Sequence, residues 1–220
     1  MNQKTFAIFD TPLNKKLISQ LTSDNQNLIL FPHFTKTAIE TDNFDLASYD
    51  WLIFTDINTV DFFVECLEKR NINLFELDEL RVCAFGEAVS DKLRLRQLHA
   101  DVIPAKLDVN TVISAIKEYE SDFESQRFLI INTKNSEKNL EHAFESENAN
   151  FDVLSVYEFD KLEISPRLKA LIKGGAIDEF IFNSPEDVCD FVAIINDRDL
   201  DFSATDSVTE QNLKENGLLV

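Results

Sequence analysis

The sequence predicts an α/β protein made of two similar domains, each built on a parallel sheet. Three observations carry this prediction: short apolar runs alternate with segments of helical spacing, the runs are apolar at consecutive positions, and one strand-to-helix pattern occurs twice. The chain has 220 residues, 44% of them apolar, which is enough for one large domain or for two domains of about 100 residues each. The repeated pattern favours two domains.

Seven apolar runs are the predicted strands. Each run is continuous rather than alternating, which is typical of strands that are buried on both faces of a parallel sheet. The runs end in turn or cap residues, and helical segments follow them. The predicted strands are residues 6–9, 27–31, 51–54, 82–85, 128–131, 153–157 and 180–182.

Six segments between or after these runs have the spacing of amphipathic helices. In the segment 59–69, for example, Val60, Phe63, Val64 and Leu67 form one apolar stripe. Such a stripe packs against a sheet, so these segments are expected to cover the sheet faces. The predicted helices are residues 59–69, 88–98, 109–119, 137–144, 166–173 and 185–195.

Two helix starts carry strong local signals. Ser165 precedes Pro166, and Ser184 precedes Pro185. A serine side chain can accept a hydrogen bond from a first-turn amide, and proline is favoured at the first helical position. We therefore expect two helices to begin at these prolines.

An internal repeat indicates that the α/β unit is duplicated. Residues 53–63 align with residues 181–191, so that strand end, polar turn and helix entry correspond. Residues 84–93 and 204–213 form a second pair, which follows the first at a similar interval. A duplicated unit predicts two similar domains rather than one large sheet.

Two extended segments, 33–39 and 157–164, flank the middle of the chain and suggest that one domain is inserted into the other. The first domain would then be discontinuous. We predict residues 1–34 with 162–220 as domain 1, residues 38–156 as domain 2, and residues 35–37 and 157–161 as connecting strands.

Composition excludes several classes of function. The 40 acidic and 21 basic residues give a formal net charge of −19, and no cluster of cations suits a nucleic-acid phosphate backbone. The four glycines exclude both the GxGxxG fingerprint and the Walker A loop. We therefore expect no nucleic-acid partner and no dinucleotide or P-loop chemistry.

Cellular location and metal content are also constrained. No stretch approaches the roughly 18 apolar residues of a membrane span, and the first residues do not resemble a signal peptide. Three scattered cysteines are typical of reduced thiols, and the scattered His33, His99 and His142 do not suggest a metal site. We expect a cytoplasmic protein with no membrane association and no bound metal.

Four sequence segments together resemble the uroporphyrinogen-III synthase family. WLIFTDINTVDFF is similar to the family pattern LIFTSxNAVxxF, and VCAFGEAVSDKLRLRQLHADVIP is similar to xxxIGxxTxxxLxxxGxxxDxVP. LSVYEF and IDEFIFNSPEDVCDF correspond to two further motifs of the family. The segments occur in the family's order over nearly the whole chain, so we identify a divergent member.

The resemblance implies two α/β domains joined by a two-stranded β-ladder, with a cleft between them. It implies a monomeric lyase of tetrapyrrole, porphyrin and heme biosynthesis that needs no cofactor. Its substrate would be hydroxymethylbilane, which loses water and closes to uroporphyrinogen III after inversion of ring D through a spiro intermediate. Asp56, Val89, Asp206 and Thr11 depart from the family pattern. They motivate an alternative, a non-catalytic relative that acts as a binding or regulatory module.

The resemblance also implies the site residues. Tyr157 matches a tyrosine near the family's cleft and is the expected catalytic residue; alternatively, it is an amphipathic side chain that ends a strand with its hydroxyl in water. The substrate has eight carboxylates, and amides at helix N-termini can bind such groups. The predicted substrate-binding residues lie in four strand-to-helix turns: Thr55, Asn58, Gly86, Glu87, Ala88, Asn183, Ser184, Ser207 and Thr209. Ser184 and Thr209 are also expected to cap helices.

Overall fold

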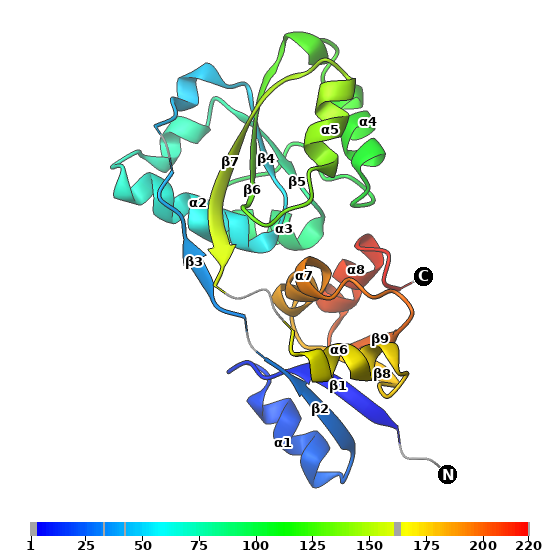
Figure 1. The fold of residues 1–220 in the computed structure, drawn as a ribbon. Coiled ribbons are helices and arrows are strands. Elements are labelled where there is room, and N and C mark those ends of the chain that lie inside the picture. Colours follow the sequence, from blue (N-terminus) through cyan, green and yellow to red (C-terminus); the bar gives the residue numbers. More distant parts are fainter. Residues whose placement is uncertain (1–3, 33, 42, 161–163, 220) are drawn as a thin grey trace. The chain divides into compact units, whose positions relative to one another are not determined.

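The protein is described by a computed structural model, which covers residues 4–32, 34–41, 43–160 and 164–219 (Figure 1). The chain divides into two compact units. Unit 1 consists of residues 1–35 and 159–220, and unit 2 of residues 36–158. Within the described residues, no helix has the length and apolar character needed to cross a membrane.

Unit 1 contains a four-stranded parallel sheet with the order β2-β1-β8-β9. Phenylalanines from three of its strands and one helix form the core of the unit, among them Phe9, Phe31, Phe180 and Phe191, all 1% exposed or less. Its elements are β1 (Thr5–Phe9), α1 (Lys15–Ser23), β2 (Asn27–Phe31), α6 (Pro166–Lys173), β8 (Glu179–Phe182), α7 (Pro185–Ile194), β9 (Asp201–Ala204) and α8 (Ser207–Glu215).

Unit 2 contains a five-stranded sheet with the order β3-β7-β6-β4-β5. One side of this sheet packs on a core that includes Trp51, Phe128 and Phe144, none of which is exposed. Its helices and strands are β3 (Lys36–Ala38), β4 (Trp51–Phe54), α2 (Ile57–Lys69), β5 (Arg81–Ala84), α3 (Glu87–Leu95), α4 (Val109–Tyr119), β6 (Arg127–Thr133), α5 (Asn139–Ser146) and β7 (Asn150–Phe159), with short 3-10 helices at Leu46–Ser48, Leu74–Leu77 and Phe123–Ser125.

The two sheets repeat one strand order. The order β2-β1-β8-β9 corresponds to β7-β6-β4-β5, and each β4-α2-β5-α3 element has a counterpart in β8-α7-β9-α8. The chain order differs, because β4 and β5 precede β6 and β7, whereas β8 and β9 follow β1 and β2. In each sheet the connections run outward from a central pair, β1 and β8 or β4 and β6. Open α/β sheets bind ligands at the carboxyl ends of such a pair.

All seven predicted strands and all six predicted helices occur, with ends shifted by a few residues. Ser165 accepts from Leu168 N at 3.3 Å and Ser184 from Asp187 N at 3.2 Å, so both helices begin as predicted. Helix α1 was not predicted, and β9 and α8 were expected only through the repeat that aligns residues 204–213 with residues 84–93. Strand β9 is exposed or half-buried throughout and so carries little apolar signal of its own, whereas α1 has helically spaced apolar residues, Leu17, Ile18 and Leu21, none of which is fully buried.

The structure does not confirm a separate two-stranded ladder. Strand β3 is the edge strand of the unit 2 sheet and lies beside β7, so it forms part of that sheet. A backbone hydrogen bond of 3.0 Å joins Asp160 N to Thr35 O. Residues 161–163, which fall partly in the predicted connecting strand 157–161, lie outside the described residues. An edge strand such as β7 has unpaired backbone groups that readily accept another strand, here β3.

Candidate functional site

The carboxyl ends of β4 and β6 form the centre of the candidate site in unit 2. Thr55 follows β4, and both its amide and its Oγ1 donate to Ile131 O of β6, at 3.3 and 3.0 Å. These two bonds hold the ends of the central strands together. Thr55 also lines a cavity of about 170 Å³ whose walls include Phe85, Ile130 and Asn132.

Asn132, at the end of β6, was not among the predicted site residues. Its side chain is 4% exposed and is held from both sides, because Nδ2 donates to Ser136 Oγ at 2.9 Å and Oδ1 accepts from Ser155 Oγ at 3.1 Å. A polar residue at the end of an otherwise apolar strand was the signal that could have revealed it. Asn132 gives the cavity a fixed polar wall.

Tyr157, on β7, is buried rather than at the surface. It is 2% exposed, and its ring stacks on Phe62 of α2 with a centroid separation of 4.9 Å and an interplanar angle of 17°. Its hydroxyl donates to Asp56 Oδ2 at 3.1 Å. The expected alternative, a hydroxyl that points into water at a strand end, does not match this geometry.

Asp56 is the N-cap of α2 and the hydrogen-bond partner of Tyr157. Its Oδ1 accepts from Asn58 N at 2.8 Å and from Thr59 N at 3.1 Å, which leaves Oδ2 for the tyrosine. Burial of the carboxyl raises the pKa of Asp56 above its ordinary value, while these hydrogen bonds and the charge of Lys36 offset part of the effect. The site therefore holds a carboxyl group that binds its proton more strongly than a carboxyl in water does.

Asn58 lies in the first turn of α2 and contributes a buried donor. Its backbone amide is bonded to Asp56, whereas its side-chain Nδ2 is buried without a hydrogen-bond partner among the described residues. An unpaired buried donor costs about 1–3 kcal/mol. A substrate oxygen at this position would recover that cost.

Three of the four predicted turns have first-turn amides that are already bonded to a cap side chain, namely that of Asp56, Ser184 or Asp206. The exception is the turn at Gly86, which caps α3 without a side-chain hydrogen bond. Gly86 has φ 85° and ψ 169°, a conformation that favours glycine. Glu87 is exposed, whereas Gly86 and Ala88 are buried, so the exposed side chain of this turn is acidic.

The unit 1 residues lie at the ends of the neighbouring strands β8 and β9. Ser184 is 6% exposed and its Oγ accepts from Asp187 N, while Asn183 Oδ1 accepts from Thr205 Oγ1 at 2.7 Å. Asn14, fully buried after β1, donates from Nδ2 to Asp187 Oδ2 at 3.0 Å. A buried polar network therefore joins the carboxyl ends of β1 and β8.

Thr209 is fully buried in the first turn of α8. Its amide donates to Asp206 Oδ1 at 2.9 Å and its Oγ1 to Asp206 Oδ2 at 2.8 Å. Partial burial of Asp206 tends to raise its pKa, but the bonds from Thr209 and Val208 outweigh this and lower it. The Thr209 hydroxyl could contact a substrate only if its hydrogen bond to Asp206 broke. The neighbouring Ser207 is exposed.

The structure thus brings the predicted residues together as two groups, one in each unit. Thr55, Asn58 and the turn at residues 86–88 follow strands of unit 2, and Tyr157 lies on its strand β7. Asn183, Ser184, Ser207 and Thr209 follow strands of unit 1. Within the described residues, no group of three or more His, Cys, Asp or Glu side chains is placed to hold a metal ion.

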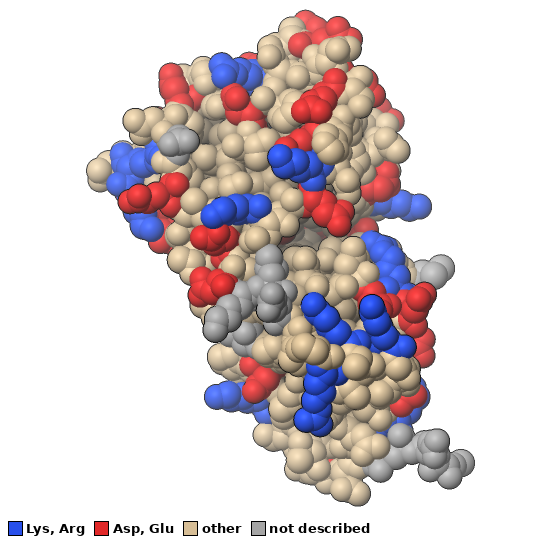
Figure 2. Space-filling view, in the orientation of Figure 1, with Lys and Arg blue, Asp and Glu red and all other residues tan. Residues whose placement is uncertain are grey.

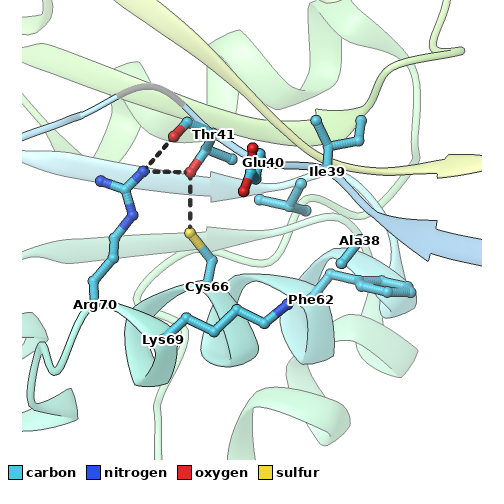
Figure 3. A pocket seen from close by; sticks show the side chains of 9 residues that line it. Ala38, Ile39, Glu40, Thr41, Phe62, Cys66, Lys69 and Arg70 are labelled. Carbon is cyan, nitrogen blue, oxygen red and sulfur yellow. Dashed lines mark hydrogen bonds between the residues drawn. The ribbon is translucent and has the colours of Figure 1, made fainter.

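A second cavity of unit 2, of about 220 Å³, lies between the segment after β3 and helix α2 (Figure 3). Arg70 Nη2 donates to Thr41 O and Oγ1 at 2.5 and 2.7 Å, and Cys66 Sγ lies 3.2 Å from Thr41 Oγ1. Phe62 lines this cavity as well as stacking on Tyr157. The polar groups of its wall are largely engaged with one another, and no predicted site residue lines it.

On the face shown in Figure 2, basic and acidic side chains are interspersed over unit 2, whereas basic side chains gather over α6 of unit 1. Several of the basic residues form ion pairs with acidic neighbours, as between Lys134 and Glu158 at 2.7 Å. Exposed pairs of this kind contribute at most about 1 kcal/mol each. The described residues that line the cavity beside Thr55 include no Lys or Arg.

Two α/β units, each with polar residues at the carboxyl ends of central parallel strands, define a two-domain α/β protein with ligand positions typical of open sheets. A family model described as uroporphyrinogen-III synthase HemD matches residues 29–220. The chain belongs to this family.

Known proteins resemble the chain in sequence and in fold. A uroporphyrinogen-III synthase of Chlorobaculum parvum is 25% identical over 183 residues, which cover 80% of this chain and 74% of the relative. A mutant uroporphyrinogen III synthase of Thermus thermophilus has a TM-score of 0.65 at 14% identity, with 96% of this chain and 88% of that chain covered. Another structure of the Thermus thermophilus enzyme has a TM-score of 0.60 at 15% identity, with coverages of 97% and 90%. These structures share the fold.

Proposed function

We propose that this chain is a uroporphyrinogen-III synthase, a lyase that converts hydroxymethylbilane to uroporphyrinogen III with inversion of ring D. Family membership over residues 29–220 and the relative from Chlorobaculum parvum support this activity and do not favour a non-catalytic relative. The observation that carries the assignment of the site is the buried Tyr157 hydroxyl, which is bonded to Asp56 beside the central strands of unit 2.

Backbone and neutral donors bind the carboxylates of the substrate in this proposal. The turn at Gly86 lacks a capping side chain, so its first-turn amides, at the positive end of the α3 dipole, are proposed to bind a substrate carboxylate. The unpaired Nδ2 of Asn58 is a further donor. Asn183, Ser184, Ser207 and Thr209 are the proposed substrate-binding residues of unit 1.

Tyr157 is the proposed catalytic residue. The reaction begins when the hydroxymethyl group loses its oxygen as water, a step that needs a proton donor at that oxygen. The Tyr157 hydroxyl is such a donor, and its burial excludes competing water. A carbon of ring D then attacks the cation that remains, and the ring rearranges through the spiro intermediate before the macrocycle closes.

The decisive experiment supplies hydroxymethylbilane made enzymatically and resolves the type I and type III isomers after oxidation. We expect type III, formed faster than the spontaneous cyclisation that yields type I. Type I alone, at the spontaneous rate, would refute the proposed function.

Tyr157→Phe tests the role of the hydroxyl. We expect turnover about 100-fold slower or more, because a positioned acid contributes about 10²–10⁴-fold. Far-ultraviolet circular dichroism should remain that of the native protein. Unchanged kinetics would remove the catalytic role of Tyr157 while leaving the function intact.

The proposal includes the monomeric state and cytoplasmic location expected from the sequence. Light scattering after size exclusion tests the first, with an expected mass of 25.2 kDa. A mass twice as large would show a dimer.

A further inference from the structure

We propose that Asp56 is a positioning residue that sets the direction of the Tyr157 hydroxyl proton, and so decides whether this hydroxyl can protonate the departing oxygen of the substrate. The inference rests on the proposed function. Asp56 stands where the similar motif of the family has serine.

The two carboxylate oxygens of Asp56 have separate roles. Oδ1 is held by the amides of Asn58 and Thr59 at 2.8 and 3.1 Å, which fixes the plane of the carboxyl group. Oδ2 lies 3.1 Å from the Tyr157 hydroxyl. Because the Tyr157 ring is buried and stacked on Phe62, rotation about the phenol C–O bond is the main freedom left to the hydroxyl.

The protonation state of Asp56 therefore determines where the tyrosine proton points. An ionised carboxylate accepts this proton and keeps it away from the substrate. A protonated carboxyl donates to the tyrosine oxygen instead and leaves the tyrosine proton available. The groups that face the carboxyl are the two α2 amides and Tyr157 of β7, with Lys36 of β3 acting through its charge.

The proton transfers balance over one catalytic cycle. Tyr157 gives its proton to the hydroxymethyl oxygen, the C–O bond breaks with its electron pair on oxygen, and water departs. Asp56 passes its proton to the tyrosine oxygen and becomes ionised. The pair regains one proton when the terminal pyrrole carbon, having formed the closing bond, loses its hydrogen.

Two substitutions separate this role from helix capping, since asparagine and serine both cap helices well. In Asp56→Asn, the amide oxygen has to face the α2 amides, so the NH₂ group faces Tyr157 and imitates the protonated carboxyl. In Asp56→Ser, the short side chain can cap but cannot reach Tyr157. Asp108→Asn and Asp108→Ser are matched controls, because Asp108 caps α4 in the same unit without a tyrosine partner.

The experiment measures type III formation from hydroxymethylbilane against pH for wild type and each variant, with and without Tyr157→Phe. The wild-type kcat should fall as pH rises through the titration of Asp56, by up to about tenfold per pH unit. Asp56→Asn should vary less than about twofold over the same range. Asp56→Ser should lower kcat by about 10- to 100-fold with little change in KM.

In the Tyr157→Phe background neither Asp56 substitution should have a further effect, because Asp56 acts through the hydroxyl. The Asp108 variants should keep the wild-type profile. Two outcomes would overturn the inference if the wild-type protein forms type III: a pH profile of Asp56→Asn that still follows the wild type, or Asp56 effects that persist in the Tyr157→Phe background. Both would leave the proposed function standing. If Asp56→Ser does not fold, the Asp56→Asn profile alone decides.

Discussion

Removing the Asp206 carboxylate should destabilise the protein more than removing an otherwise similar helix cap. Asp206 accepts three hydrogen bonds: from Val208 N at 2.9 Å, from Thr209 N at 2.9 Å and from Thr209 Oγ1 at 2.8 Å. Loss of an aspartate cap costs about 1 kcal/mol. Thr209 is fully buried, so Asp206→Ala also leaves a buried hydroxyl unpaired, which costs about 1–3 kcal/mol more.

Asp108→Ala is the matched comparison. Asp108 likewise accepts from the amide and the hydroxyl of a threonine three residues later, but Thr111 is only partly buried, so its hydroxyl can turn to water. We therefore expect a loss of about 2–4 kcal/mol in the free energy of unfolding for Asp206→Ala and about 1 kcal/mol for Asp108→Ala.

Urea unfolding followed by far-ultraviolet circular dichroism measures both values. Asp206→Asn, which retains a capping oxygen, should recover most of the loss. Equal losses for the two alanine variants would show that the buried hydroxyl contributes nothing, and the reasoning from burial would fail.

Three further predictions concern unit 2. The Asp56 pKa is raised in the folded state, so the contribution of Asp56 to the free energy of unfolding is fully present at pH values below the ordinary 3.8 and is lost as pH rises through the folded-state pKa. The free energy of unfolding of wild type relative to Asp56→Asn should therefore fall as pH rises, and an increase would contradict the assigned burial. Phe144→Ala empties a fully buried aromatic position and should cost about 3–5 kcal/mol in urea unfolding; a loss below 1 kcal/mol would indicate a loosely packed core. Gly86→Ala forces a side chain into φ 85° and should cost about 1–2 kcal/mol by the same assay; an unchanged free energy of unfolding would contradict this strain.

The regular elements were largely predictable because their signals are local. Residues 51–54 and 128–131 are apolar at consecutive positions and form the central strands of unit 2, buried on both faces. The prolines after Ser165 and Ser184 mark helix starts in the same local way. Strand β9, at the edge of its sheet, is exposed or half-buried throughout and leaves little apolar pattern.

The candidate site was predictable only in part. Tyr157 was predicted as a site residue and Asp56 was noted as a departure from the family pattern, but the hydrogen bond between them was not predicted. The two residues are 101 positions apart, and no local pattern reports a contact over that separation. The same holds for Asn132 and Ser155, which are 23 positions apart and are joined by the pairing of β6 with β7.

By itself, the sequence determined the α/β class, the duplicated strand-to-helix unit and the family, because apolar runs, helical periodicity and ordered motifs are properties of neighbouring residues. Only the tertiary structure decided which polar groups are already satisfied and which remain available. Asp206 accepts a hydrogen bond from the Thr209 hydroxyl. Asp56 accepts one from the Tyr157 hydroxyl, because strand pairing and helix packing bring these distant side chains within hydrogen-bond distance. Burial and hydrogen bonding at those positions depend on the whole fold.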